Sequence, residues 1–365
     1  MRIERQLVFW AGAAVVLLGL VALLREVLLP FVAGTIIAYF LNPVADRLER
    51  VGIGRTTAAV LVVAAVGVLV ILAAVLLAPL IAGQLRQLIE TLPADVAKLK
   101  VATEAWLEQT LGGRYPSLVA GIERALADLS QSWAALGATV AKALWSQGVA
   151  IVNFVSLLLI TPVVVFYLLV DWHKMLDKLD SWLPRDHAAT IRRLAIKINE
   201  AISAFIRGQG TICIILGIFY AAGLTSIGLP YGLLIGVATG FLAFVPFVGW
   251  AAGLLTAGGV ALAEGWPSLI LLAKVIAVFA AGVALDSAVL SPKIVGERIG
   301  LHPVWLIFAL FVFSYLFGFV GLLVAVPVAA ACGVLIRFGL ELYLGSSLYR
   351  GAEPLDIGHG GGPAT

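Results

Sequence analysis

The feature that most constrains the fold of this chain is a series of long apolar runs that carry almost no charge. A helix needs about 20 apolar residues to cross the ~30 Å hydrocarbon core of a bilayer, and most of the runs have roughly that length. Stretches such as AAVLVVAAVGVLVILAAVLLAPLIA show none of the alternation expected of a membrane β-strand. The runs cover residues 7–24, 28–41, 57–82, 149–170, 209–228, 231–263, 268–290 and 303–340.

Composition agrees with a membrane environment. Hydrophobic residues make up 62% of the chain and charged residues 12%, against roughly 45–50% and 25% in soluble domains. We therefore expect an all-α integral membrane protein with about eight helical membrane segments and the lipid bilayer as a partner. The net charge of +3 is small and dispersed, which excludes nucleic acid as a partner.

Lysine and arginine indicate the orientation, because they concentrate in cytoplasmic loops. They precede the first run, follow the second around Arg47 and crowd the segment 174–207, which places both termini in the cytoplasm. Within 83–148 we expect an extracytoplasmic amphipathic helix over 117–145, whose apolar face packs on its own domain or contacts another subunit. The expected units are 1–82 (three transmembrane helices), 83–148 (the amphipathic region), 149–207 (a transmembrane helix and a cytoplasmic loop), 208–342 (a transport core with two hairpins) and 343–365 (a disordered cytoplasmic tail).

Two of the runs are too long for one span and contain a break. The run 231–263 breaks at AFVPFVGWAAG and the run 303–340 at YLFGFVGLLVAVP. Each follows a single span, and the two spans run in opposite directions, so a span and a hairpin occur twice with inverted topology. This pattern is typical of secondary transporters, whose broken helices meet near the bilayer midplane. Two ordinary pairs of short spans are the alternative. The predicted tips contain Pro246, Phe247 and Gly249 in the first hairpin, and Gly318 and Gly321 in the second.

Asp286 is the acidic residue that stands out in the membrane runs. An ionised carboxylate costs a few kilocalories per mole there, about 2.5–3.5 at a helix centre, so it marks a candidate proton or cation carrier. The alternative is a structural carboxylate that caps a helix or pairs with a lysine. Lys274, about 18 Å away along the same helix, is a poor partner. Asn153, Thr239 and Thr256 are further candidates for solute contact, although such groups more often bond to backbone or hold helices together.

The sequence contains none of the motifs that indicate catalysis. It has no HExxH, no Gly-x-Ser-x-Gly, no Cys/His metal spacing and no phosphate-binding loop. We therefore expect no enzyme activity, no cofactor and no metal.

Several stretches together resemble the autoinducer-2 exporter family, also called PerM-type permeases. They are AYFLNPVADRLERVGIGRTTA, VVVFYLLVDWHKM, FIRGQ, FVPFVGW and SPKIVGERIGLHPVWLIFALFVFSYLFGFVGLLVAVPVAA. The resemblance implies a bacterial inner-membrane transporter and a homo-oligomer, with a pentamer as one candidate assembly. Some members are similar to exporters of the small hydrophilic quorum-sensing signal, and others resemble sodium or lithium/proton antiporters.

The resemblance also marks individual positions. Asp286 is followed by Ser287 where the family commonly has asparagine, which puts amide-dependent ion coordination in doubt. The other motif positions are Asn42, Pro43, Asp171, Arg207, Gly208, Gln209, Pro292, Gly296, His302, Pro303 and Pro327.

The function expected from these features is that of a secondary transporter that exports a small polar solute such as autoinducer-2. A sodium or lithium/proton antiporter is the alternative, with a monovalent cation as its partner. A membrane scaffold that transports nothing, and interacts through the 117–145 helix, is the second alternative.

Overall fold

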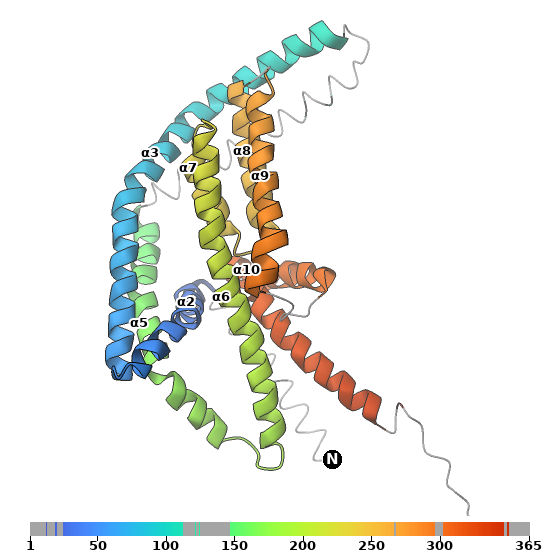
Figure 1. Ribbon diagram of the computed structural model, residues 1–365. Coiled ribbons are helices and arrows are strands. Elements are labelled where there is room, and N and C mark those ends of the chain that lie inside the picture. Colours follow the sequence, from blue (N-terminus) through green and yellow to red (C-terminus); the bar gives the residue numbers. More distant parts are fainter. Residues whose placement is uncertain are drawn as a thin grey trace, which may run out of the picture.

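The computed structural model describes residues 12, 19, 25–111, 121, 124, 147–265, 268–295, 302–346 and 349 (Figure 1). Every regular element in these ranges is a helix, and seven of the helices are long and apolar enough to cross a membrane. The expected all-α membrane protein is confirmed. The elements are α2 (Arg25–Arg50), α3 (Arg55–Leu111), α5 (Gln147–Ser181), α6 (Ala188–Ser226), α7 (Gly232–Leu242), α8 (Val248–Gly265), α9 (Ile270–Leu285), the π-helix η1 (Asp286–Val295) and α10 (Pro303–Gly345).

Some predicted features fall outside the described residues. These are most of the first apolar run, nearly all of the 117–145 amphipathic helix, Gly296 and almost the whole C-terminal tail. Asn153 lies in α5, but its side chain is likewise outside the description.

Helix α3 links two parts of the molecule. It begins after a turn in which Gly52 has a φ of 97° and continues unbroken past residue 82, where the sequence changes from apolar to polar. It arches over the far ends of α7 and α8 (Figure 1). In its polar half, the Gln84 side-chain oxygen accepts a 2.9 Å hydrogen bond from the backbone N–H of Leu234. Because Leu234 lies in the first turn of α7, Gln84 satisfies an N–H that would otherwise lack an intrahelical partner.

Helix α6 runs through the middle of the molecule and packs closely against α7 (Figure 1). Gly232, Gly236 and Gly240 recur at every fourth position of α7, and they face α6. A Cβ at Gly240 would overlap the Cα of Gly217, and one at Gly236 would overlap the backbone of Ala221. Small residues at this spacing let two helix backbones approach one another within a membrane.

Both predicted breaks are present. Helix α7 ends at Leu242 and α8 begins at Val248, and the turn between them includes Phe247 with a φ of 68°. Helix α10 is interrupted at Gly318, whose φ of 61° and ψ of −136° favour glycine. Figure 1 shows α10 turning sharply there.

The first break packs against the helix that contains the second. Val245, in the turn between α7 and α8, is buried in one hydrophobic cluster with Leu310 from the first part of α10 and with Ala325 and Val326 from its second part. Phe205 of α6 belongs to the same cluster. The two broken segments therefore converge on the central helix.

Candidate functional site

Asp286 is the first residue of the π-helix η1. Helix α9 ends at Leu285, and ten residues then adopt π-helical geometry. Pro292 lies inside η1 and has no N–H to donate to the preceding turn, so regular α-helical bonding cannot continue through it. Because π-helical turns are rare and occur frequently at functional sites, this irregularity singles out the segment around Asp286.

A serine hydroxyl lies beside the Asp286 carboxylate. The Ser291 hydroxyl donates a 2.8 Å hydrogen bond to Asp286 Oδ1. Helix η1 packs on α6, and Asp286 is close enough to act electrostatically on Cys213 and Tyr220 of that helix. Asp286 is half-buried and forms no ion pair with any described residue.

Tyr220 of α6 lies beside Gly282 of α9, which is four residues before Asp286. Its ring stacks on Phe279, with the ring centroids 4.7 Å apart, and its hydroxyl lies against Gly282. The side chain is 1% exposed, and among the described residues its hydroxyl has no hydrogen-bond partner. A buried phenol normally finds a partner, so Tyr220 adds an unsatisfied hydroxyl to the neighbourhood of the carboxylate.

The other predicted transport residues do not gather at Asp286. Thr239 is buried against Gly253 and donates its hydroxyl to the Ile235 carbonyl at 2.7 Å, while Thr256 donates to Ala252 at 2.8 Å. Ser287, next to Asp286, donates to the Val283 carbonyl of α9 at 2.6 Å and not to the carboxylate. Lys274 is exposed near the opposite end of α9.

The tip between α7 and α8 is held by a residue of the family motif. Gln209 Nε2 of α6 donates a 2.5 Å hydrogen bond to the Ala243 carbonyl at the start of the turn. Gly249 is buried, and a Cβ there would crowd the backbone of Ala243. Pro246 and Phe247 complete the turn, with Phe247 half exposed. Gly208 is buried beside Gln209 in α6.

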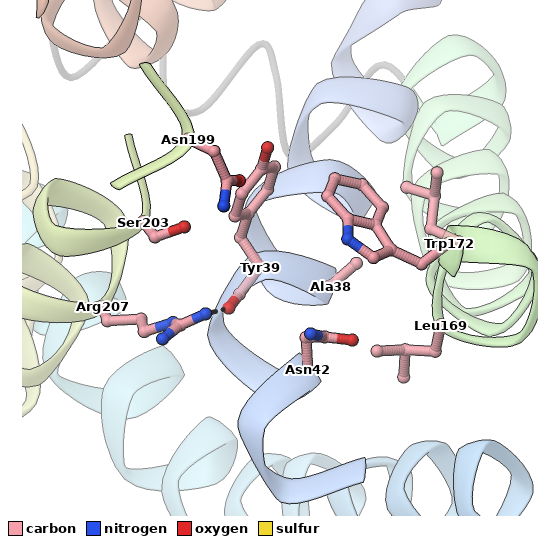
Figure 2. Close-up of a pocket in the computed structure, with 9 residues that line it drawn as sticks. Ala38, Tyr39, Asn42, Leu169, Trp172, Asn199, Ser203 and Arg207 are labelled. Atoms are coloured by element: carbon pink, nitrogen blue, oxygen red, sulfur yellow. Dashed lines mark hydrogen bonds between the residues drawn. The ribbon is translucent and has the colours of Figure 1, made fainter. Parts of the chain in front are cut away.

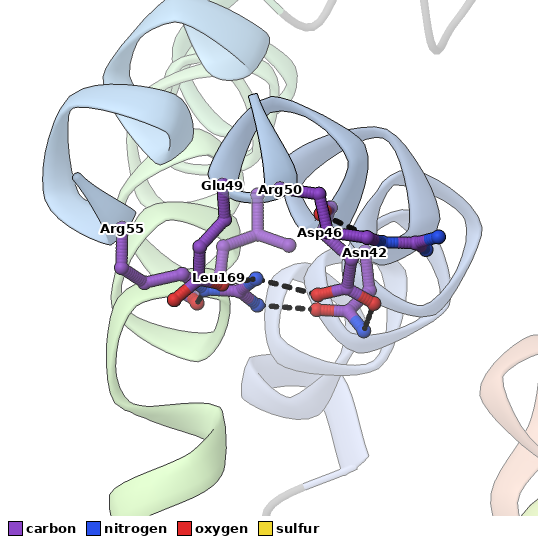
Figure 3. Close-up of polar contacts among 6 residues, drawn as sticks. All are labelled: Asn42, Asp46, Glu49, Arg50, Arg55 and Leu169. Carbon is purple, nitrogen blue, oxygen red and sulfur yellow. Dashed lines mark hydrogen bonds and ion pairs between the residues drawn. The ribbon is translucent and has the colours of Figure 1, made fainter. Parts of the chain in front are cut away.

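Arg55 joins α2, α3 and α5 through a polar network (Figure 3). Its Nε donates to the Leu169 carbonyl at 2.7 Å, its Nη2 to Asn42 Oδ1 at 2.6 Å and its Nη1 to Asp46 Oδ1 at 2.5 Å. The Arg55 side chain is 13% exposed. The side-chain oxygen of Asn42, a motif position, thus accepts a hydrogen bond within a network that joins three helices. The motif stretch contained Arg55, but the spacing of the sequence gave no sign of its partner on α5.

A polar hollow lies between α2, α5 and α6, with a cavity volume of about 40 Å³ (Figure 2). Arg207 Nε donates a 3.2 Å hydrogen bond across it to the Tyr39 carbonyl, and the rings of Tyr39 and Trp172 meet edge to face at 5.0 Å. The structure thus brings together Arg207 and Asn42, which the sequence had marked, with polar side chains that it had not. The lining residues are Ala38, Tyr39, Asn42, Leu168, Leu169, Trp172, Asn199, Ser203 and Arg207.

The remaining motif positions occupy helix ends and breaks. Asp171 pairs with Lys174 at 3.2 Å, outside the hollow. His302 is the N-cap of α10, where its side chain accepts a hydrogen bond from the Val304 N–H, and Pro303 is the first helical residue. Pro43 lies within α2, Pro327 is buried in α10, and Gly321 packs on Phe313 just after the α10 break. Among the described residues no group of His, Cys, Asp or Glu could hold a metal ion.

Comparison with known proteins gives one consistent result. The model of the family described as "AI-2E family transporter" matches residues 9–341. The chain is 30% identical to "Putative permease PerM" of Escherichia coli (strain K12), over 87% of this chain and 89% of that protein. It is 26% identical to "Putative transport protein YueF" of Bacillus subtilis (strain 168), over 82% and 81% of the two chains.

Proposed function

This chain belongs to the AI-2E transporter family, and we propose that it is a secondary transporter that exports a small polar solute such as autoinducer-2. The proposed setting is the bacterial inner membrane, with both termini in the cytoplasm and with the chain assembled as a homo-oligomer. The positive-inside distribution of lysine and arginine supports this orientation.

The observation that carries the proposal is the meeting of the two broken segments on α6. Val245 of the first break packs with Leu310 and Val326, which flank the second break in α10. Irregular backbone is tolerated within a membrane only where protein or a water-filled cavity surrounds it. Two discontinuous helices that pack on a common central helix form the arrangement in which one repeat can rock against the other.

Asp286 is the proposed coupling residue. An intramembrane carboxylate without a basic partner among the described residues can alternate between a protonated and an ionised state, and each state favours different neighbours. The Ser291 hydroxyl donates to Oδ1 and orients the carboxylate within η1. Rearrangement of η1 on α6 would link the state of this carboxylate to the broken segments.

One observation favours sodium or lithium/proton antiport as a second candidate function. The Ser291 hydroxyl on the Asp286 carboxylate offers a second oxygen atom beside the two of the carboxylate. A hard monovalent cation prefers oxygen ligands, and protons could compete with it for the same carboxylate.

The test is flux into liposomes that contain the purified protein. Internal pH is recorded while sodium, lithium or the signalling furanone is added outside, and furanone uptake is measured directly. The wild type is compared with Asp286→Asn and with a carboxylate control, Glu264→Gln, at the exposed end of α8. A pH change driven by a cation, and lost only in Asp286→Asn, supports antiport. Furanone flux without a pH response supports facilitated export, and absence of every flux supports the scaffold alternative.

A further inference from the structure

The hollow between α2, α5 and α6 lies where three apolar runs end. Tyr39 is close to the end of the run 28–41, Trp172 follows the run 149–170, and Arg207 precedes the run 209–228. Tyrosine and tryptophan concentrate at membrane–water interfaces, and arginine anchors there with its charge toward the headgroups. The hollow therefore lies at the level of lipid headgroups, on the lysine- and arginine-rich side.

The walls of the hollow offer hydrogen-bond donors and no negative charge. None of the nine lining residues is acidic, and the formal charge comes from Arg207. Two nearby acids are already paired, Asp46 with Arg55 and Asp171 with Lys174. The charge distribution of the hollow therefore favours binding of an anion.

Several of these donors are unused within the described part of the chain. The Ser203 side chain is 8% exposed, and its hydroxyl has no hydrogen-bond partner there. Arg207 uses only its Nε, so its two terminal amino groups remain for a ligand. A hydroxyl this deeply buried normally has a partner, and an unsatisfied one that lines a cavity indicates a missing acceptor. Figure 2 shows Ser203 and Arg207 on the same wall, opposite Tyr39.

We propose that this hollow binds the phosphate of an anionic phospholipid from the cytoplasmic leaflet. Phosphate supplies acceptors for both Arg207 and Ser203, and a guanidinium matches its geometry well. A lipid is favoured over free phosphate because Trp172, Leu168 and Leu169 line the same hollow and provide apolar contact for a glycerol backbone and the first acyl carbons. The cavity of about 40 Å³ has room for only a few waters or for part of a headgroup, so the remainder of the lipid would lie outside it.

Native mass spectrometry of the full chain in detergent tests the assignment by titration with phosphatidylglycerol, with phosphatidylcholine and with inorganic phosphate. The wild type binds phosphatidylglycerol more tightly than phosphatidylcholine. Arg207→Gln weakens phosphatidylglycerol binding about fivefold or more, because one basic side chain at the membrane surface contributes about that factor. Arg193→Gln, an exposed arginine of α6 outside the hollow, stays close to the wild type. Ser203→Ala removes a donor and leaves the hydrogen bond between Arg207 and Tyr39 in place. This variant therefore tests lipid binding in the hollow even if Arg207→Gln does not fold.

Three results would overturn the proposal. The first is equal affinity of the wild type for the two lipids. The second is wild-type affinity for phosphatidylglycerol in both Arg207→Gln and Ser203→Ala. The third is tight binding of inorganic phosphate that displaces phosphatidylglycerol, which would assign the hollow to a free anion. None of these results bears on whether the protein transports solute, because Asp286 lies outside the hollow.

Discussion

The Ser291 hydroxyl lies 2.8 Å from a carboxylate oxygen of Asp286, five residues earlier in the chain. In an α-helix the residues that face one another are three or four positions apart, whereas the wider turn of a π-helix brings i and i+5 together. The irregular helix η1 therefore has a chemical consequence, because it gives an intramembrane carboxylate a hydroxyl neighbour.

The first prediction separates the two serines of η1. Ser291→Ala removes the donor to Asp286 and should weaken cation-driven or solute-driven flux about tenfold, the usual value of a hydrogen bond to a charged group. Ser287→Ala should have a smaller effect, because its hydroxyl donates to the Val283 carbonyl of α9 and not to Asp286. Concentration dependence of flux in liposomes measures both. A larger effect at Ser287 than at Ser291 would contradict the geometry of the site.

The second prediction concerns the contact between α6 and α7. Gly240→Ala places a methyl group on the Cα of Gly217, so the helices must separate, and the protein should lose about 1–3 kcal/mol of stability. Gly67→Ala in α3 is the matched control, because nothing lies within 4 Å of its Cβ position. Thermal unfolding in detergent, with both variants compared with the wild type, gives the measurement. Equal melting temperatures for the two variants would show that the close packing is not needed.

The sequence was sufficient to predict the all-helical membrane fold of the described residues and the two breaks. Long apolar runs have few alternatives to helices in a membrane, and the Pro246 and Gly318 segments interrupt runs too long for one span. Composition alone did not indicate that a single helix, α3, continues past the change from apolar to polar sequence at residue 82. The apolar and polar halves of α3 are both rich in good helix formers, and a single Gly83 costs only about 1 kcal/mol.

The sites were less predictable than the helices, for a physical reason. Asp286 stands out because charge is rare in apolar runs, but its neighbours depend on the hydrogen-bond register of η1, which the sequence signals only through Pro292. The hollow joins Tyr39 to Arg207 across 168 positions. The periodicity of a single helix cannot predict a contact between residues so far apart in the sequence. Tyr220 and Ser203 were not predicted either, because the burial of their hydroxyls depends on the packing of α6 against other helices.

The third prediction tests the network around Arg55. Arg55→Gln leaves Asp46, Asn42 and the Leu169 carbonyl without their cationic donor, and because the Arg55 side chain is only 13% exposed, the loss should reach about 2–4 kcal/mol. Arg192→Gln is the control, since its pair with Asp180 is exposed and should contribute little. The unfolding midpoints of the two variants are compared. If Arg55→Gln loses no more stability than Arg192→Gln, the Arg55 network does not stabilise the fold.

The fourth prediction concerns the break in α10. Gly318 has a backbone conformation that strains any residue with a Cβ, so Gly318→Ala should cost about 1–3 kcal/mol or allow the helix to straighten. Gly339→Ala, in the same helix and with open space around it, should have neither effect. Transport and the melting temperature are measured together. Reduced flux with an unchanged melting temperature would indicate a straightened helix, and an unaffected Gly318→Ala would show that the break is dispensable.

The last prediction distinguishes a re-entrant hairpin from two short full spans. In a variant without Cys213 and Cys332, a cysteine replaces Phe247 at the α7–α8 turn, and a membrane-impermeant thiol reagent is applied to inverted and to right-side-out vesicles. Arg185→Cys and Ser226→Cys, at exposed positions near opposite ends of α6, serve as controls for the two sides. If the hairpin is re-entrant, its tip is enclosed by protein beside α6 and α10, and the cysteine at 247 should react more slowly than either control. Two full spans would instead bring the turn to the cytoplasmic surface, because 232–242 and 248–265 would then both cross the bilayer. Reaction at the rate of Arg185→Cys, from the cytoplasmic side alone, would therefore exclude the re-entrant arrangement and, with it, the structural basis of the proposed rocking motion.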